Sequence, residues 1–266
     1  MRSAPSAREG HSLPFSRRAR YPSAMTTIAL YGSGEFLPWS TPIDDWCLER
    51  SAIPGDRVVI LPTASAPEGD DAFSRWARMG IDHYEQRGLR PEVLDVRARA
   101  DAEREDIAAR IDGARLIFFS GGNPGFLAET LAGTRLWRAV HEAVSNGVAL
   151  AGCSAGAVFL GVRAPDVRDG PSKIRWVDGV RLLSLAFIAP HFDLLDTYQP
   201  GLRDRMVGAC PPGCMLVGID EDTAFCGDGE EWTVLGKRSG WIGGVDALAE
   251  HPAGEPVRVP LGLRLP

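Results

Sequence analysis

A Gly-x-Ser-x-Gly segment is the strongest chemical signal in the chain. It reads Gly152-Cys-Ser-Ala-Gly156, follows the apolar run 148–151 and leads into a helix-compatible Ala-Val-Phe. A strand that turns sharply into a helix here exposes the central hydroxyl at the carboxyl end of a sheet, and the glycines avoid collisions in the turn. The pattern predicts Ser154 as a strained, exposed nucleophile and the Ala155 amide as an oxyanion donor. The segment alone leaves open a small-residue turn without chemistry.

A serine nucleophile needs a base, and the chain has five histidines. Four of them fall near the termini or within helix-like segments, where we expect loops or solvated faces: His11, His83, His141 and His251. His191 follows the apolar run 185–189 and Pro190, which predicts a position at the end of a strand. We therefore predict that His191 takes the proton of Ser154.

Two further groups must complete the site. A carboxylate should orient His191, and the candidates on either side of it stay open from the residues alone: Asp166, Asp169, Asp178, Asp193, Asp220 and Glu221. A second oxyanion donor is predicted at the Gly122 amide, because Gly121-Gly122-Asn123 ends an apolar run and lets backbone approach a ligand closely. An ordinary strand-to-helix turn is the alternative for that segment.

Apolar runs typical of buried strands alternate with helix-like segments. The strand-like runs are 26–31, 57–61, 93–96, 116–119 and 148–152, and the helix-like segments are 70–87, 101–112 and 125–146. This alternation predicts an α/β fold, a three-layer sandwich with a mostly parallel central sheet. Later strands are expected at 216–219 and 232–235, with a hairpin turn at 237–240 leading to Trp241.

Composition bounds the function. The 266 residues carry 29 Lys and Arg against 35 Asp and Glu, a net charge of −6 that argues against a generally basic nucleic-acid binder. The five cysteines are an odd number at irregular spacing, which favours reduced thiols in the cytoplasm over a disulfide framework or a metal site. No apolar run is long enough to predict a membrane span.

The amino-terminal region has a different character. Residues 1–24 are rich in Arg, Ser, Pro and Ala and lack the apolar core of a secretory signal. We expect a disordered extension there, with Met25 as a candidate start of translation. Residues 25–266 are expected to form a single domain.

At these motifs the chain resembles the dipeptidase E and cyanophycinase family of serine peptidases, whose sheet is like that of class I glutamine amidotransferases. The resemblance spans about residues 28–242. It rests on five segments: Gly32-Ser-Gly-Glu35, Ser120-Gly-Gly-Asn123, Gly152-Cys-Ser-Ala-Gly-Ala157, Pro190-His-Phe192 and Gly218-Ile-Asp-Glu-Asp-Thr-Ala224.

The resemblance implies a peptidase-like α/β domain that cleaves small peptides through an acyl-enzyme, without metal or cofactor. By position it implies Ser154 as nucleophile, His191 as base, and the amides of Gly122 and Ala155 as oxyanion donors. The spacing within the family favours Asp169 as the acid, with Asp166 second. Glu221 is an alternative or supporting group, and Asn123 is a further supporting candidate. Monomer and homodimer both stay open.

Two other functions stay open at this point. Class I glutamine amidotransferases place a cysteine at the centre of the elbow, so Cys153 would serve a glutamine amidohydrolase; its place before the centre instead predicts a side chain in the core. A chain that kept the fold and lost its acid would be a binding module. Arg203 and Arg205 are candidates for a substrate carboxylate or for a solvated helix face.

Overall fold

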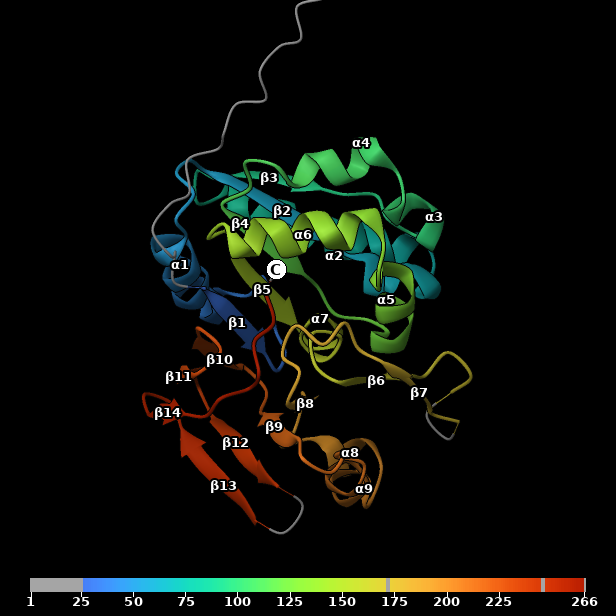
Figure 1. The fold of residues 1–266 in the computed structure, drawn as a ribbon, viewed down its shortest axis with the longest axis vertical. Coiled ribbons are helices and arrows are strands. Elements are labelled where there is room, and N and C mark those ends of the chain that lie inside the picture. Colours follow the sequence, from blue (N-terminus) through green and yellow to red (C-terminus); the bar gives the residue numbers. More distant parts are fainter. Residues whose placement is uncertain (1–25, 171–172, 245–246, 266) are drawn as a thin grey trace, which may run out of the picture.

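The chain folds around one large sheet and a smaller one (Figure 1), as seen in a computed structural model that describes residues 26–170, 173–244 and 247–265. The extension predicted for residues 1–24 lies outside the described residues. The expectation of a single domain over 25–266 stays a prediction. Among the described helices, none has the length and apolar character needed to cross a membrane.

The large sheet contains the strands predicted at 26–31, 57–61, 93–96, 116–119, 148–152 and 232–235, whereas the strand predicted at 216–219 belongs to a second sheet. The members of the large sheet are β1 (Ile28–Tyr31), β2 (Arg57–Leu61), β3 (Arg90–Val93), β4 (Leu116–Phe119), β5 (Ala149–Cys153), β10 (Thr223–Gly227), β11 (Glu231–Gly236) and β14 (Pro256–Arg258). They lie in the order β14-β11-β10-β1-β5-β4-β2-β3. The five strands from β1 to β3 pair in parallel, and the other three pair antiparallel. The predicted mostly parallel sheet is confirmed.

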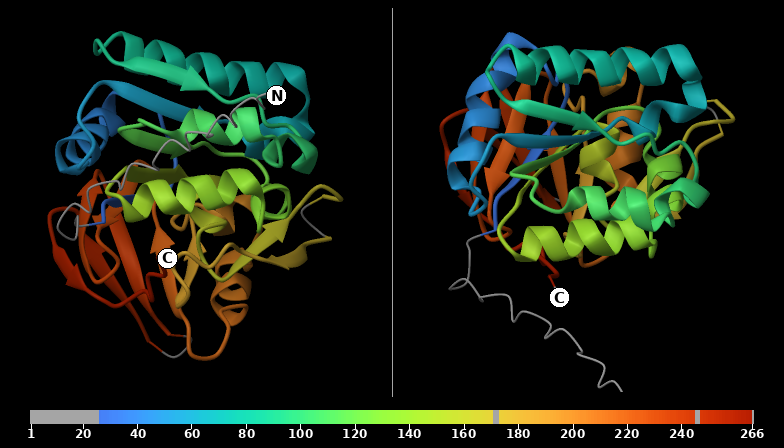
Figure 2. Two further views of the ribbon diagram at one scale, coloured as in Figure 1. Left: turned by 45° about the horizontal axis from the view of Figure 1, so that its top comes forward. Right: turned by 90° about the horizontal axis from the view of Figure 1, so that it is seen from above.

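Helices cover both faces of the parallel strands. The helical segments up to residue 158 are η1 (Pro38–Ser40), α1 (Thr41–Arg50), η2 (Thr63–Glu68), α2 (Asp70–Glu85), α3 (Arg99–Ala102), α4 (Glu105–Ala108), η3 (Ala109–Ile111), α5 (Pro124–Leu131), α6 (Arg135–Ser145) and α7 (Ala155–Val158). Alternate strand residues enter two separate cores, one shared with α1 and α2 and the other with α3 to α7. Figure 2 shows α2 and α6 on opposite sides of the strands, so the predicted three layers are present.

Three predicted elements differ in their boundaries. The helix expected over 101–112 is divided into α3, α4 and η3. The helix expected over 125–146 is divided, because the chain turns at Gly133 and the Thr134 side chain accepts a hydrogen bond from the Trp137 amide at the start of α6. The strand expected at 93–96 is β3, which ends at Val93 where its pairing with β2 stops.

The sequence did not predict a second sheet. It contains β8 (Ala186–Ala189), β9 (Met215–Ile219), β12 (Ser239–Gly244) and β13 (Ala247–Pro252), in the order β13-β12-β9-β8. The hairpin predicted at 237–240 is wrong: β11 pairs with β10 and β14, whereas β12 pairs with β9 and β13, so this turn carries the chain between sheets. The remaining elements are the hairpin of β6 (Arg163–Asp166) and β7 (Arg175–Asp178), and the helices α8 (Leu195–Tyr198) and α9 (Leu202–Gly208).

The register of the parallel strands brings their carboxyl ends to one edge. Tyr31 lies opposite Cys153, Gly152 opposite Phe119, and Phe119 opposite Leu61. The loops that follow β1, β2, β4 and β5 therefore meet there, which is where open α/β sheets place their sites.

Candidate active site

The nucleophile elbow has the predicted geometry. Ser154 has φ of 49° and ψ of −109°, a strained conformation for a residue with a side chain. A Cβ at Gly152 would lie 2.0 Å from the Gly156 carbonyl oxygen, and one at Gly156 would lie 2.1 Å from that of Phe119. Both glycines are therefore required for this turn. The helix that follows is only the four-residue α7, so the local amides matter more here than a long helix dipole.

Ser154, His191 and Glu221 form a continuous hydrogen-bonded line. Ser154 Oγ lies 2.9 Å from His191 Nε2, and His191 Nδ1 lies 2.5 Å from Glu221 Oε1. A carboxylate accepts, so neutral His191 carries its proton on Nδ1 and its Nε2 accepts from the serine hydroxyl. This tautomer is the one that a base acting on Ser154 requires.

His191 and Glu221 both come from the smaller sheet. β8 and β9 pair in parallel with Ala189 opposite Gly218, and the two residues follow the ends of these strands. The prediction that His191 follows a strand is confirmed, although that strand belongs to the second sheet. The Phe192 amide donates to the Ile219 carbonyl at 3.0 Å, and His191 itself has φ of 52°. These features turn the imidazole toward the elbow and the carboxylate toward the imidazole.

Two residues hold Glu221 in place: Ser33, which the sequence analysis did not single out, and Asp193, which it weighed only as a candidate acid. The Ser33 hydroxyl, after β1, donates to Glu221 Oε2 at 2.6 Å and accepts from the Asp222 amide at 3.0 Å. Asp193 accepts from the Glu221 amide at 2.9 Å, and Arg238 donates to its other oxygen at 2.7 Å. Ser33 lies in the Gly32–Glu35 segment, which was recognised as a motif without a role for its serine.

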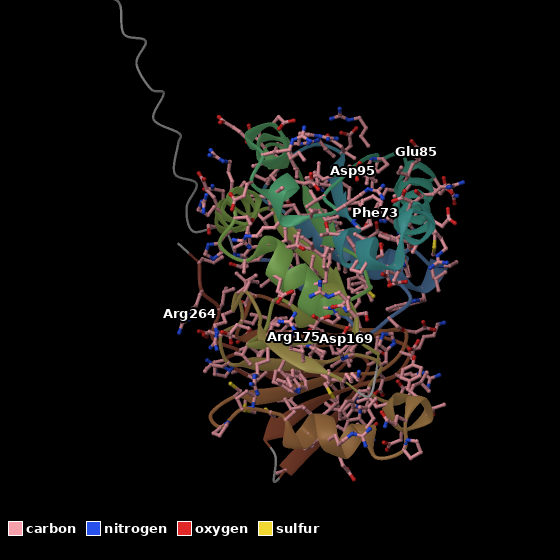
Figure 3. All side chains as sticks on the ribbon, turned by 90° about the vertical axis from the view of Figure 1, so that its right-hand side faces the viewer. Phe73, Glu85, Asp95, Asp169, Arg175 and Arg264 are labelled. Carbon is pink, nitrogen blue, oxygen red and sulfur yellow. The ribbon has the colours of Figure 1, made fainter. Side chains whose placement is uncertain are left out.

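The expected contact of Asp169 with His191 is not present. Asp169 lies on an exposed turn after β6 (Figure 3), and its carboxylate has no hydrogen-bond or ionic partner in the described part of the chain. The carboxylate that meets the imidazole belongs to Glu221, which the sequence analysis held as an alternative. The spacing along the chain favoured Asp169, but spacing does not show the path of the chain. After the elbow the chain forms the β6–β7 hairpin, and Asp169 lies in the turn of that hairpin.

Asp166 and Asn123, the other predicted supporting residues, belong to a structural hydrogen-bond network. Asp166 accepts from Arg168, from Arg175 at 2.5 Å, and from Asn123 Nδ2 at 3.1 Å. These donors, Arg168 foremost, hold the pKa of Asp166 well below its usual range. Asn123 also accepts from the Phe126 amide and so caps α5. Together they fasten the loop that carries Gly122.

The predicted oxyanion amides lie at the expected edge. A Cβ at Gly121 would come 3.6 Å from Ser154 Cβ, so the Gly121-Gly122 loop borders the nucleophile. Across the described residues, the Gly122 and Ala155 amides have no backbone or side-chain acceptor. Both groups are thus available to donate to a ligand atom at the serine.

Cys153 faces away from this line. Its side chain is fully buried, and its thiol donates to Glu35 Oε2 at 2.8 Å. Burial and then the neighbouring Glu35 raise the pKa of the thiol well above its usual value. A protonated, enclosed thiol is a poor nucleophile, so the geometry does not fit the amidohydrolase alternative.

The surroundings of His191 are aromatic. The Tyr198 ring lies edge-on at 6.0 Å from the imidazole and is largely exposed; partial burial and Glu221 raise the pKa of its hydroxyl. Arg203 stacks on Phe192 and Trp241, with its guanidinium carbon 4.4 Å and 4.5 Å from the ring centroids. Arg205 is exposed and donates to the Pro200 carbonyl. The two arginines therefore differ, and Arg203 is the one held beside the site.

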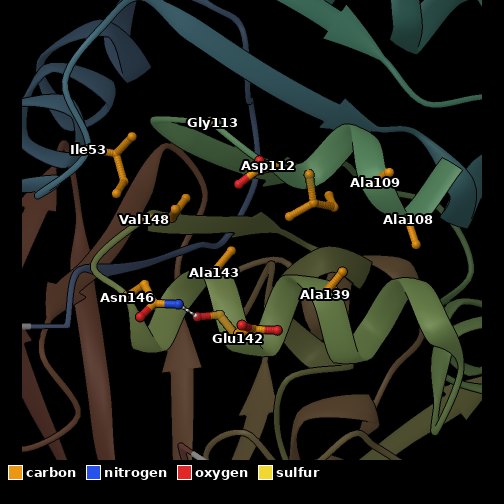
Figure 4. A pocket seen from close by; sticks show the side chains of 11 residues that line it. Ile53, Ala108, Ala109, Asp112, Gly113, Ala139, Glu142, Ala143, Asn146 and Val148 are labelled. Carbon is orange, nitrogen blue, oxygen red and sulfur yellow. Dashed lines mark hydrogen bonds between the residues drawn. The ribbon is translucent and has the colours of Figure 1, made fainter. Parts of the chain in front are cut away.

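The site does not coincide with a cavity of about 450 Å³ beside α6 (Figure 4). That cavity is lined by Val148, which precedes β5, whereas Ser154 follows it, so the two lie at opposite ends of the strand. Within residues 26–170, 173–244 and 247–265, no three His, Cys, Asp or Glu side chains are grouped to hold a metal ion.

The chain is similar to proteins of one family in sequence and structure. The model of Peptidase family S51 matches residues 28–235. A cyanophycinase of Trichormus variabilis is 27% identical over 192 residues, covering 68% of this chain and 61% of the relative. A cyanophycinase of Synechococcus elongatus is 32% identical over 196 residues, covering 69% and 58%. The chain thus spans about three fifths of the length of these relatives.

Solved structures agree with the fold. A peptidase from an acI-B1 Actinobacterium superimposes with a TM-score of 0.79 at 29% identity, over 88% of this chain and 97% of that one. A protein of Listeria monocytogenes EGD-e superimposes with a TM-score of 0.60 at 22% identity, over 80% and 100%. The second likeness concerns the fold alone.

Proposed function

The chain belongs to peptidase family S51, a family of serine-type peptidases, and from this premise we propose that it hydrolyses small peptides through an acyl-enzyme formed on Ser154. The observation that carries the proposal is the line from Ser154 Oγ through His191 to Glu221, with separations of 2.9 Å and 2.5 Å. A histidine within reach of the serine and backed by a carboxylate also argues against an inactive binding module.

In the proposed reaction Ser154 attacks the scissile carbonyl while His191 Nε2 takes the hydroxyl proton. The amides of Gly122 and Ala155 donate to the oxyanion, and His191 then protonates the leaving amine. Water, deprotonated by the same imidazole, releases the acyl group from Ser154. Glu221 orients the imidazole and stabilises its charged form, and Ser33 holds the carboxylate in place.

A fluorophosphonate probe tests the nucleophile without knowledge of the substrate. We expect it to label the wild type and not Ser154→Ala, while iodoacetamide leaves the activity of the wild type unchanged because the Cys153 thiol is enclosed. Equal labelling of both proteins, or loss of activity with iodoacetamide and no labelling of Ser154, would contradict the proposal.

A library of dipeptides and β-aspartyl peptides, with Ser154→Ala as the blank, tests the substrate class. Turnover that depends on Ser154 would support the proposed small-peptide activity; cleavage only of long polypeptides would contradict it.

The five cysteines are free, which supports a reducing compartment such as the cytoplasm as the proposed location.

A further inference from the structure

Glu35 is a buried carboxylate beside the nucleophile that the proposed reaction does not use. Only 2% of the residue is exposed, and it lies in the loop after β1. Its Oε1 accepts from the Gly121 amide at 2.8 Å, and its Oε2 accepts from the Cys153 thiol at 2.8 Å. Each of these donors directly precedes a residue of the proposed machinery: Gly122 in one case and Ser154 in the other.

The arrangement links the two loops that must cooperate. Gly121 lies two residues after the end of β4, and Cys153 is the last residue of β5. A Cβ at Gly121 would lie 3.3 Å from Glu35 Oε1 and 3.6 Å from Ser154 Cβ. The carboxylate thus fixes the separation of an oxyanion amide from the nucleophile. A displacement of about 1 Å between such groups lowers a rate by roughly 10²-fold.

We propose that Glu35 is a positioning residue, which joins the oxyanion loop to the nucleophile elbow through the Gly121 amide and the Cys153 thiol. The inference rests on the proposed function, since it assigns Glu35 to the same reaction. It also gives the buried Cys153 a role as a hydrogen-bond donor. A hydroxyl at position 153 would keep that role, whereas a methyl group would remove it.

The rate of fluorophosphonate labelling, normalised to folded protein, tests the inference. We expect Glu35→Ala to label about 10²-fold more slowly than the wild type. Glu35→Gln keeps an acceptor for the Gly121 amide, so it should stay within about tenfold of the wild type. With a turned-over peptide, the loss should lie in kcat rather than in KM.

Asp44→Ala is the matched control, because Asp44 is another fully buried carboxylate with hydrogen-bonded partners, none of which belongs to the oxyanion loop or to the elbow. We expect this variant to label at the wild-type rate once normalised to folded protein. An equal loss in Asp44→Ala and Glu35→Ala would mean that any buried carboxylate supports labelling through stability, and would overturn the positioning role.

A double-variant comparison tests the thiol arm. Cys153→Ala should label about tenfold more slowly, Cys153→Ser should recover the rate, and Cys153→Ala combined with Glu35→Ala should be no slower than Glu35→Ala alone. Losses that multiply in the double variant would overturn the linkage. A wild type that fails to label would refute the proposed function itself, whereas a labelled wild type with an equally fast Glu35→Ala refutes only this inference.

Discussion

Two of the histidine–carboxylate pairs in the described part of the chain, His191–Glu221 and His83–Asp44, differ in their burial and in what surrounds them. His191 meets Glu221 at 2.5 Å, with 27% and 23% of the side chains exposed. His83 of α2 meets Asp44 of α1 at 2.8 Å, with 8% and 0% exposed. The first pair follows two strand ends and faces a serine in a strained turn. The second joins two helices against the sheet.

The partners of Asp44 explain why the second pair is structural. Tyr31 donates to it at 2.8 Å and Tyr84 at 3.3 Å, in addition to His83. Burial, and after it Asp44, raises the pKa of both tyrosines well above the usual value. The expectation that His83 faces solvent is therefore wrong. The His191–Glu221 pair differs because the hydroxyl of Ser154, in a strained turn, lies 2.9 Å from its imidazole, and this difference supports the proposed catalytic role.

Replacing each histidine in turn should show the largest difference between the two pairs, in activity for one and in stability for the other. His191→Ala deletes the proposed base, so we expect kcat to fall by about 10⁴–10⁶-fold with little change in thermal stability. His83→Ala should keep kcat per folded molecule and lower the melting temperature, because it leaves the buried Asp44 without one donor. Peptide turnover and thermal unfolding of both variants check this. A comparable kcat loss in His83→Ala would break the distinction.

Replacing each candidate acid by its amide should give the next largest difference in activity. Glu221→Gln should lower kcat by roughly 10²–10⁴-fold, since an amide favours the wrong tautomer of His191. Asp169→Asn, on an exposed turn, should leave kcat unchanged. Steady-state kinetics with one peptide decide between them. If Asp169→Asn were the impaired variant, the geometric assignment would have to be abandoned.

This pair of acids marks the limit of prediction from the sequence. The elbow at Ser154, the strand-end position of His191 and the parallel sheet could be predicted because each depends on local information: flanking glycines, a preceding apolar run and continuous apolar runs. The contact of Glu221 with His191 depends on the pairing of β8 with β9, which are separated by 25 residues between Ala189 and Met215. Such a long-range pairing leaves no local pattern, and the second sheet was missed for the same reason.

The contacts of Ser33 and Glu35 show the same limit more sharply. Both residues stand in a recognised motif after β1, yet their partners are Glu221 in one case and Gly121 with Cys153 in the other. A motif indicates that a loop matters. Only the register of β1 beside β5 and β10 shows which loops it touches.

Replacing Asp44 tests whether the buried pair stabilises the fold. Asp44→Ala leaves two tyrosine hydroxyls and His83 without their shared acceptor, so the free energy of unfolding should fall by about 3–5 kcal/mol. Urea unfolding at neutral pH measures this. An equivalent change at the exposed Asp45 neighbour, Asp45→Ala, should have an effect below about 1 kcal/mol and is the matched control. Equal effects would show that the buried network is not stabilising.

The smallest expected effect concerns acid stability at Asp166. Its pKa is lowered in the folded chain, mainly by Arg168, so the carboxylate contributes stability that is present above its unfolded pKa of about 3.9 and is lost as the pH falls below it. Asp166→Asn should therefore be less stable than the wild type at pH 7, and the difference should narrow toward pH 3. Urea unfolding at the two pH values measures it, with Asp169→Asn as the exposed control. If the stability difference between the wild type and Asp166→Asn were the same at both pH values, the charge of Asp166 would not be its stabilising feature. Its shape and hydrogen bonds, which asparagine copies only in part, would then account for the effect.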